Sequence, residues 1–186
     1  MAHIRTIGYD EAIGRLLEIY DELIKKRGKI ADIHKIQSLR PESIVKHMDL
    51  YLEIMFSRSE LSRAEREMMA VVVSTANGCS YCKAHHQAAF RHYVKDEQKI
   101  KAIGDPTHYH ELSEREAALC HFARRLTLEP QIHENGDFTT DLKLKGFSDQ
   151  AILDATLVVA YFNFVNRMAL ALGVATNAEE AGGYKY

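Results

Sequence analysis

Residues 67–86 read EMMAVVVSTANGCSYCKAHH. An apolar run is followed by an Asn-Gly pair, which is typical of a helix end, and then by the segment C-S-Y-C, which holds Cys79 and Cys82. We expect one helix over 62–76 and a second over 79–93, so that both sulfurs lie in or next to the first turn of the second helix. Unpaired backbone N–H groups and the positive end of the helix dipole favour a thiolate over a thiol at that place.

Two further side chains of this stretch point to proton chemistry. His86 lies four residues after Cys82, on the same helical face, so its imidazole can reach that sulfur. Glu67 lies in the preceding helix among methionines and valines, and only the short turn between the two helices separates this helix from the dithiol. A carboxylate there can accept or relay a proton. Taken alone, Glu67 would fit the solvated edge of an amphipathic helix. We predict Cys79, Cys82, His86 and Glu67 as catalytic residues, with a lowered pKa for the Cys82 thiol.

The rest of the chain also follows a helical pattern. It contains three prolines and ten glycines, and no run shows a convincing alternation of period two. Apolar periodicity and capping residues predict further helices over 10–27, from 41 to 55 or beyond, and over 96–103, 113–126, 140–145 and 148–172. We therefore expect an all-α fold and a single domain over 1–186, with a helical extension over 1–39 and a loose tail over 175–186.

The composition is that of an ordinary globular protein. The chain has 186 residues, 46% hydrophobic and 27% charged, and its formal net charge is −2. Such a charge attracts neither nucleic acid nor an acidic membrane surface, and the longest uncharged stretch, 68–82, is too short for a membrane span. We see no secretory signal, and three cysteines do not make a disulfide scaffold. These features predict a cytoplasmic protein in a reducing compartment.

A C-x-x-C motif alone has other interpretations. It can be half of a zinc site, but no second C-x-x-C or H-x₃₋₅-H spacing accompanies Cys120 and the scattered histidines. Thioredoxin-like chemistry is disfavoured because no strand precedes the motif. Cys120 fits a buried structural thiol. Asn163, Asn166 and Arg167 interrupt an apolar helix, and we expect them to form hydrogen bonds between helices.

The pattern E-x₁₁-C-x-x-C-x₃-H resembles the signature of the alkylhydroperoxidase D-like branch of the carboxymuconolactone decarboxylase superfamily. Residues 61–67, 112–116 and 146–167 resemble that family too, so that the resemblance covers about 40–175. It implies an alkylhydroperoxidase D-like bundle of paired helices that is an obligate homo-oligomer, a homodimer or a hexamer.

The resemblance also implies an activity and a role for each residue. The family reduces hydroperoxides with a dithiol, without a metal or another cofactor, and an external dithiol or lipoyl-type reductant restores the thiols. Cys82 would be the peroxidatic sulfur, Cys79 the resolving sulfur, and His86 and Glu67 the proton relay. Tyr81 departs from the pattern, because the best-known members have histidine there, and this removes one member of the relay.

Three alternatives remain open at this point. The same disulfide could switch a helical interface in a non-enzymatic redox sensor or assembly protein. The chain could instead be a metal-binding helical module. A carboxymuconolactone decarboxylase-like reaction is the weaker inference, because the decarboxylases lack the dithiol.

Overall fold

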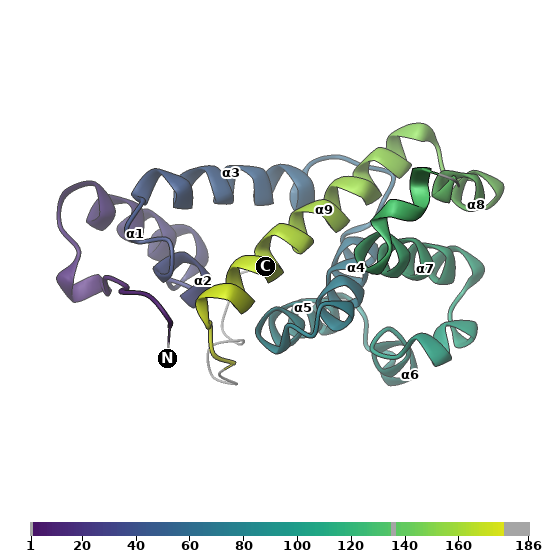
Figure 1. Ribbon diagram of the computed structural model, residues 1–186, viewed down its shortest axis with the longest axis horizontal. Coiled ribbons are helices and arrows are strands. Elements are labelled where there is room, and N and C mark those ends of the chain that lie inside the picture. The colour runs from purple at the N-terminus through teal and green to yellow at the C-terminus, as the bar shows by residue number, and fades with distance from the viewer. Residues whose placement is uncertain (1, 135–136, 177–186) are drawn as a thin grey trace.

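The computed structural model describes residues 2–134 and 137–176, and within these ranges the fold is all-helical, without a strand (Figure 1). The α-helices are α1 (Gly14–Arg27), α2 (Asp32–Lys35), α3 (Pro41–Phe56), α4 (Arg63–Ala76), α5 (Ser80–Tyr93), α6 (Glu97–Ala102), α7 (Glu114–Leu128), α8 (Phe138–Leu144) and α9 (Asp149–Leu172). Short 3-10 segments cover Tyr9–Glu11, Pro106–Glu111 and Pro130–Glu134. The predicted all-α fold class is therefore confirmed.

Helix α4 lies in the middle of the bundle. It packs against α5, α7 and α9, and every residue from 66 to 74 is buried. A helix that is buried on all sides belongs in a core, which explains its long apolar run. Its start is fixed by a capping box in which Ser62 and Glu65 bond to each other's backbone N–H groups. The sequence predicted this start correctly.

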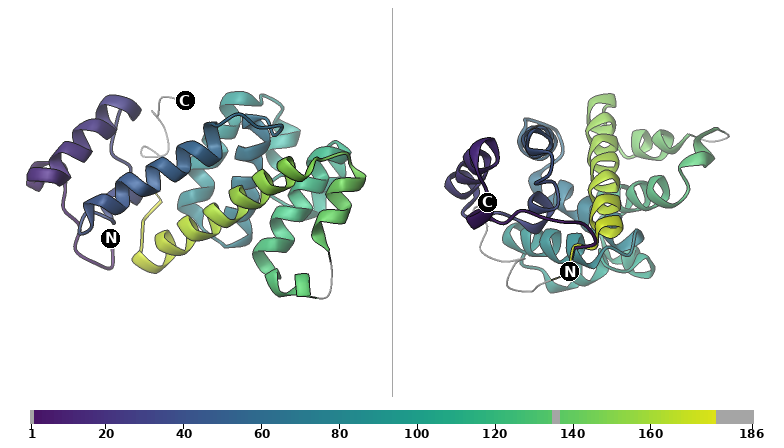
Figure 2. Two further views of the ribbon diagram at one scale, coloured as in Figure 1. Left: turned by 90° about the horizontal axis from the view of Figure 1, so that it is seen from above. Right: turned by 60° about the vertical axis from the view of Figure 1, so that its left-hand side comes forward.

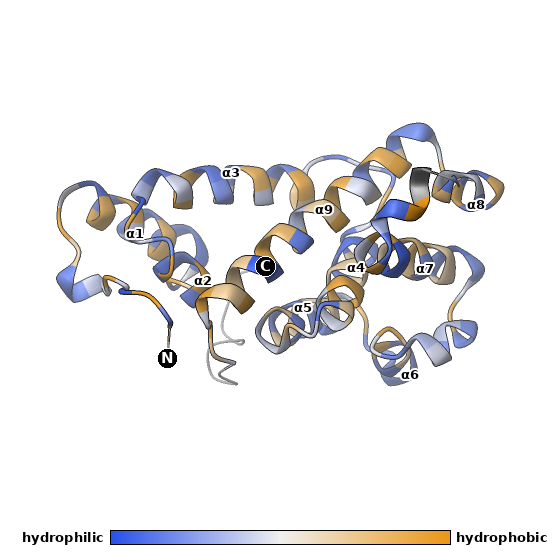
Figure 3. Ribbon diagram, viewed as in Figure 1, coloured by the Kyte–Doolittle hydropathy of each residue, from blue (hydrophilic) through white to orange (hydrophobic). Residues whose placement is uncertain are grey.

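Helix α9 crosses the bundle and lies beside α3 (Figure 2). Length and composition alone would let α9 cross a membrane, but a core helix of a globular protein passes the same test. Ten of its side chains are buried, and they pack against α3, α4, α5, α7 and α8. Apolar and polar residues are mixed along it, as the colouring of Figure 3 shows.

The N-terminal helices form one end of the molecule, and α6, α7 and α8 form the other (Figures 1 and 2). Helix α1 packs on α3 through a second small core that includes Leu16, Tyr20, Leu23 and Ile44. The Tyr20 hydroxyl donates to the Ile7 carbonyl at 2.9 Å, which fixes the segment before α1. The N-terminal extension is thus a packed part of the fold.

The predicted helix over 10–27 is wrong at its start. A 3-10 turn covers Tyr9–Glu11, and Ala12 and Ile13 are extended before α1 begins at Gly14. Gly14 has a φ of +54°, a conformation that glycine adopts at little cost, so the chain changes direction there as the helix begins. The short helix α2 was not predicted. The tail predicted over 175–186 lies outside the described residues beyond 176.

Candidate active site

The turn between α4 and α5 places the first cysteine at the junction of two helices. Gly78 takes the left-handed conformation, with a φ of +66°, and its N–H donates to the Thr75 carbonyl at 3.1 Å. The Cys79 N–H donates to the Ser74 carbonyl at 2.9 Å, which completes the hydrogen-bond pattern of a Schellman motif. Cys79 is also the N-cap residue of α5. It therefore both closes one helix and opens the next.

Side-chain amides fasten this turn to α9. Asn77 donates to Asn163 at 3.0 Å and to Asn166 at 3.3 Å, and Asn166 donates to the Ser74 hydroxyl at 3.4 Å. The predicted hydrogen bonds between helices are thus confirmed for both asparagines. The prediction is wrong for Arg167, which donates within α9 to the carbonyl and side-chain oxygens of Asn163 at 3.0 and 2.7 Å.

Glu67 and His86 meet in the interior, as the sequence predicted. The carboxylate of Glu67 is fully buried, and its Oε2 lies 2.7 Å from Nδ1 of His86. Its Oε1 accepts from Arg63 at 2.5 Å, and Arg63 also donates to the Met55 carbonyl at 2.6 Å and to the Tyr51 hydroxyl at 3.1 Å. A buried charge is costly without a partner, so the Arg63 guanidinium stabilises the Glu67 carboxylate in the interior. The contact through Nδ1 leaves Nε2 of His86 as the nitrogen not bound to Glu67.

The two thiols ionise as a coupled pair, in which Cys79 loses its proton more readily than Cys82. A hydrogen bond from the Cys82 thiol, aided by the backbone amides of Cys82 and Tyr81, lowers the pKa of Cys79 to about 7 in spite of burial. The pKa of Cys82 is raised, because this thiol donates that hydrogen bond, is buried and lies beside the Cys79 charge. The direction for Cys82 is thus opposite to the predicted one, because in the coupled pair its thiol supports ionisation of Cys79.

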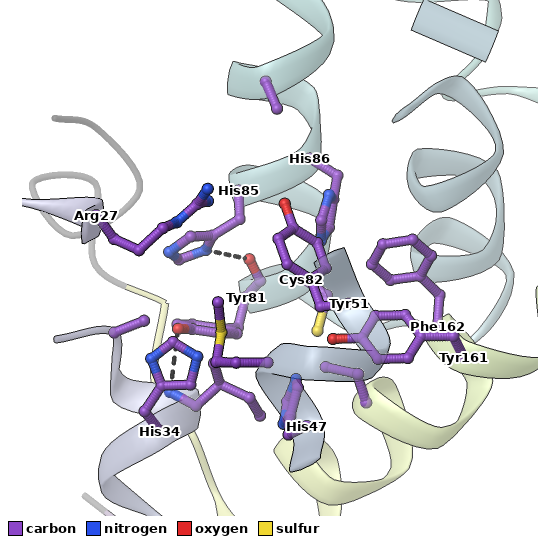
Figure 4. Close-up of a pocket in the computed structure, with 15 residues that line it drawn as sticks. Arg27, His34, His47, Tyr51, Tyr81, Cys82, His85, His86, Tyr161 and Phe162 are labelled. Carbon is purple, nitrogen blue, oxygen red and sulfur yellow. Dashed lines mark hydrogen bonds between the residues drawn. The ribbon is translucent and has the colours of Figure 1, made fainter. Parts of the chain in front are cut away.

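Cys82, rather than Cys79, lines the pocket next to this site. The pocket holds a space of about 90 Å³, and His86 lines it as well. Figure 4 shows the Cys82 sulfur, the His86 ring and the Tyr161 hydroxyl facing the same space. The remaining lining side chains come mainly from α1 to α3, α5 and α9, and they are Arg27, Ala31, Ile33, His34, His47, Met48, Tyr51, Tyr81, His85, Ala89, Phe162 and Val165. One sulfur of the dithiol is therefore presented to a small, mainly apolar space.

Tyr81 ties α5 to the N-terminal helices. Its hydroxyl accepts from the Ile33 N–H of α2 at 3.2 Å, and its ring lies 4.2 Å from that of His85, centroid to centroid. The side chain is buried, so it forms part of the pocket wall. At the position where the family pattern has an imidazole, this chain thus has a group that helps to enclose the pocket.

Several pocket or relay residues were missed from the sequence, among them Arg63, Arg27 and Tyr161. Arg63 had a local signal, because it lies four residues before Glu67 on one helix. Arg27 and Tyr161 had none, because they are brought to the site from α1 and α9 by tertiary packing. Burial raises the pKa of Tyr161 well above its ordinary value.

Cys120 is fully buried, as predicted, and does not line the pocket. Burial also raises the pKa of its thiol. Within residues 2–134 and 137–176, no three His, Cys, Asp or Glu side chains are grouped so that they could hold a metal ion.

Comparison with known proteins relates this site to one family. The family model for carboxymuconolactone decarboxylase matches residues 43–125. A solved peroxidase-related protein from Silicibacter sp. TM1040 is 30% identical, with a TM-score of 0.78, over 89% of this chain and 86% of the other.

Two further solved structures share the fold. An alkylhydroperoxidase AhpD core, a peroxidase-related protein from Ralstonia eutropha JMP134, is 24% identical over 97% of this chain and 94% of the other, with a TM-score of 0.82. A variant of the debrominase Bmp8 in complex with 2,3,4-tribromopyrrole is 18% identical over 96% of this chain and 93% of the other, with a TM-score of 0.78. At these identities the likeness concerns the fold alone.

Proposed function

Because this chain belongs to the alkylhydroperoxidase D-like and carboxymuconolactone decarboxylase superfamily, we propose that it is a thiol-dependent peroxidase that reduces organic hydroperoxides. The observation that carries this proposal is the position of Cys82. Its sulfur faces a small apolar pocket that His86 also lines, and Cys79, whose pKa is lowered to about 7, is the second sulfur three residues before it. A nucleophile, a proton-transfer group and a second sulfur are the parts that such a reaction needs.

The first step is attack by Cys82. Its proton moves to the Cys79 thiolate along their hydrogen bond, and the new Cys82 thiolate attacks the terminal oxygen of the hydroperoxide. The O–O bond breaks, and the departing alkoxide takes a proton from His86, which Glu67 orients through Nδ1. The products are an alcohol and a sulfenic acid on Cys82.

The second step closes the disulfide. Cys79 attacks the Cys82 sulfur and gives its proton to His86, which lost one in the first step; the S–O bond breaks, and His86 returns the proton to the departing hydroxyl, which leaves as water. The two cysteines are separated by only two residues at a helix start, so they can be joined with little movement of the backbone. An external dithiol, small or of the lipoyl type, then reduces the disulfide by exchange, and we expect this in the reducing cytoplasm.

The test follows the reduced protein by intact mass after addition of cumene hydroperoxide. The wild type should lose two hydrogens as the disulfide forms, and Cys82→Ser should consume no peroxide. Cys79→Ser should gain one oxygen on Cys82, trapped by dimedone, and Cys120→Ser should behave as the wild type because Cys120 lies outside the site. Peroxide consumption by Cys82→Ser at the wild-type rate would overturn the proposal.

Turnover separates this enzyme from a redox sensor. With excess dihydrolipoamide, an enzyme consumes many equivalents of hydroperoxide per dithiol, whereas a sensor is oxidised once and is then reduced slowly. A steady rate proportional to protein concentration supports the peroxidase. A single stoichiometric burst would favour the sensor.

A second candidate is reductive dehalogenation of a small aromatic ring. The observation that favours it is the number of rings around Cys82, among them Tyr51, Tyr161 and Phe162, together with the fold shared with the debrominase Bmp8. The Cys82 thiolate would take the halogen while the ring carbon takes a proton, and Cys79 would then displace halide to form the disulfide. Release of bromide from 2,3,4-tribromopyrrole, lost in Cys82→Ser, is the measurement.

A further inference from the structure

The pocket has an apolar floor and a polar opening. Ten of its lining residues are buried, among them Tyr81, Tyr161 and Phe162. The partly exposed lining residues, where the space meets solvent, are Arg27, Met48, Tyr51, His85 and His86, and four of these five carry a polar group. A ligand that reaches Cys82 therefore passes an apolar wall and leaves its outer end near these polar groups.

Arg27 provides the permanent charge of this opening. Among the lining side chains of the described chain it is the one guanidinium or ammonium group, and no carboxylate lines the pocket. Its guanidinium carbon lies 5.5 Å from the centroid of the Tyr51 ring and 5.8 Å from that of Phe56. Those two rings hold the group in place through cation–π contacts, and no hydrogen-bond acceptor among the described residues binds its donors.

No acidic side chain of the described residues pairs with Arg27, whereas Arg63, the guanidinium behind the pocket, is bound by Glu67. A guanidinium presents a planar fork of donors that matches a carboxylate. A positioned fork that has no carboxylate partner among the described residues, at the edge of an apolar pocket, is thus complementary to an anion attached to an apolar body. Neutral hydroperoxides would leave this fork without a function.

We propose that Arg27 forms a carboxylate-binding subsite, and that the preferred substrates are hydroperoxides with an apolar body and a carboxylate at the far end. The term substrate rests on the proposed function. The space of about 90 Å³ is roughly six times what one water needs, which suits the hydroperoxide group and a short apolar segment beside Cys82. The carboxylate would then lie outward, at the guanidinium.

The first test compares two hydroperoxides that differ in one group. Cumene hydroperoxide and its 4-carboxy derivative share the ring and the peroxide, so the ratio of their kcat/KM values isolates the carboxylate. We expect the ratio to favour the acid in the wild type and to fall about 10-fold or more in Arg27→Met, as for loss of a charged hydrogen-bond pair. Lys25→Met, which removes one exposed charge from the same helix, should leave the ratio unchanged.

The second test measures binding without chemistry. Kd for 4-isopropylbenzoate, which carries no peroxide, should rise about 10-fold in Arg27→Met and less in Arg27→Lys, with circular dichroism as the check of folding. Equal Kd values in the wild type and Arg27→Met, or no binding to the wild type, would overturn the subsite. Loss of binding in the variant without turnover of either peroxide would overturn the peroxidase and support the subsite.

Discussion

Cys79 is the more readily ionised thiol of the reduced pair, whereas Cys82 faces the pocket. This difference between the two cysteines favours both the attack on the hydroperoxide and the later reduction of the disulfide. The thiolate formed on Cys82 during attack belongs to the thiol of higher pKa and is the stronger nucleophile. When a reductant attacks the disulfide at Cys82 from the pocket, Cys79 departs as the thiolate of lower pKa, which leaves faster.

The hydrogen bond between the two thiols makes the ionisation of Cys79 dependent on its neighbour. Because the pKa of Cys79 is lowered to about 7 from an ordinary 9.0, its thiolate forms as the pH rises through neutrality. Cys82→Ala removes the largest cause of this shift, so the pKa of Cys79 should rise toward 9.0. Absorbance of the thiolate at 240 nm against pH measures it.

The control for that titration is Cys120→Ser. Burial raises the pKa of Cys120, so its loss should leave the step near pH 7 unchanged. A step at the same pH in Cys82→Ala as in the wild type would show that the Cys82 thiol does not stabilise the Cys79 thiolate.

The left-handed residue at the α4–α5 turn permits a test on the scale of an element. A Cβ at Gly78 would meet no atom within 4 Å, so Gly78→Ala tests the backbone conformation alone. With a φ of +66°, the alanine should lower the free energy of unfolding by about 1 kcal/mol, and asparagine by less. Urea denaturation measures both.

Gly8→Ala is the matched control. A Cβ there also meets nothing within 4 Å, but its φ of −73° suits any residue. That variant should be as stable as the wild type or more stable by up to about 1 kcal/mol. Equal effects at the two glycines would show that the left-handed turn is not the cause.

Helix ends could be predicted from the sequence where their signals are local. Ser62 and Ser113 each form a capping box with a glutamate three residues later, and α4 and α7 begin where these pairs indicate. Glu67 and His86 were predicted to converge because they lie on two consecutive helices that are joined by a short turn. The pKa order of the two cysteines could not be predicted, because it depends on which sulfur donates to the other. Nor could Arg27 be placed, because packing of distant helices brings it to the pocket.

On the scale of the molecule, the pocket joins two parts of the chain. The family model matches residues 43–125, which contain the dithiol, whereas Arg27, Ile33 and His34 precede it on α1 and α2. Bond-breaking groups and ligand-recognising groups thus come from different segments. A change in the N-terminal helices could alter substrate preference while the cysteines and their relay remain the same.

The outer face of α9 bears on assembly. Leu153, Leu157 and Phe164 lie on one side of this helix, and 57%, 41% and 48% of their surfaces are exposed. An apolar stripe of this kind is typical of a surface covered by another subunit, and we propose that two copies pair across it.

Sedimentation of the wild type should then give at least twice 21.2 kDa. Leu157→Glu should shift the protein toward monomer, because it would bury a charge without a partner. Leu144→Glu, at a residue of α8 that is 78% exposed, should not. A monomeric wild type, or equal shifts in both variants, would contradict pairing through this stripe.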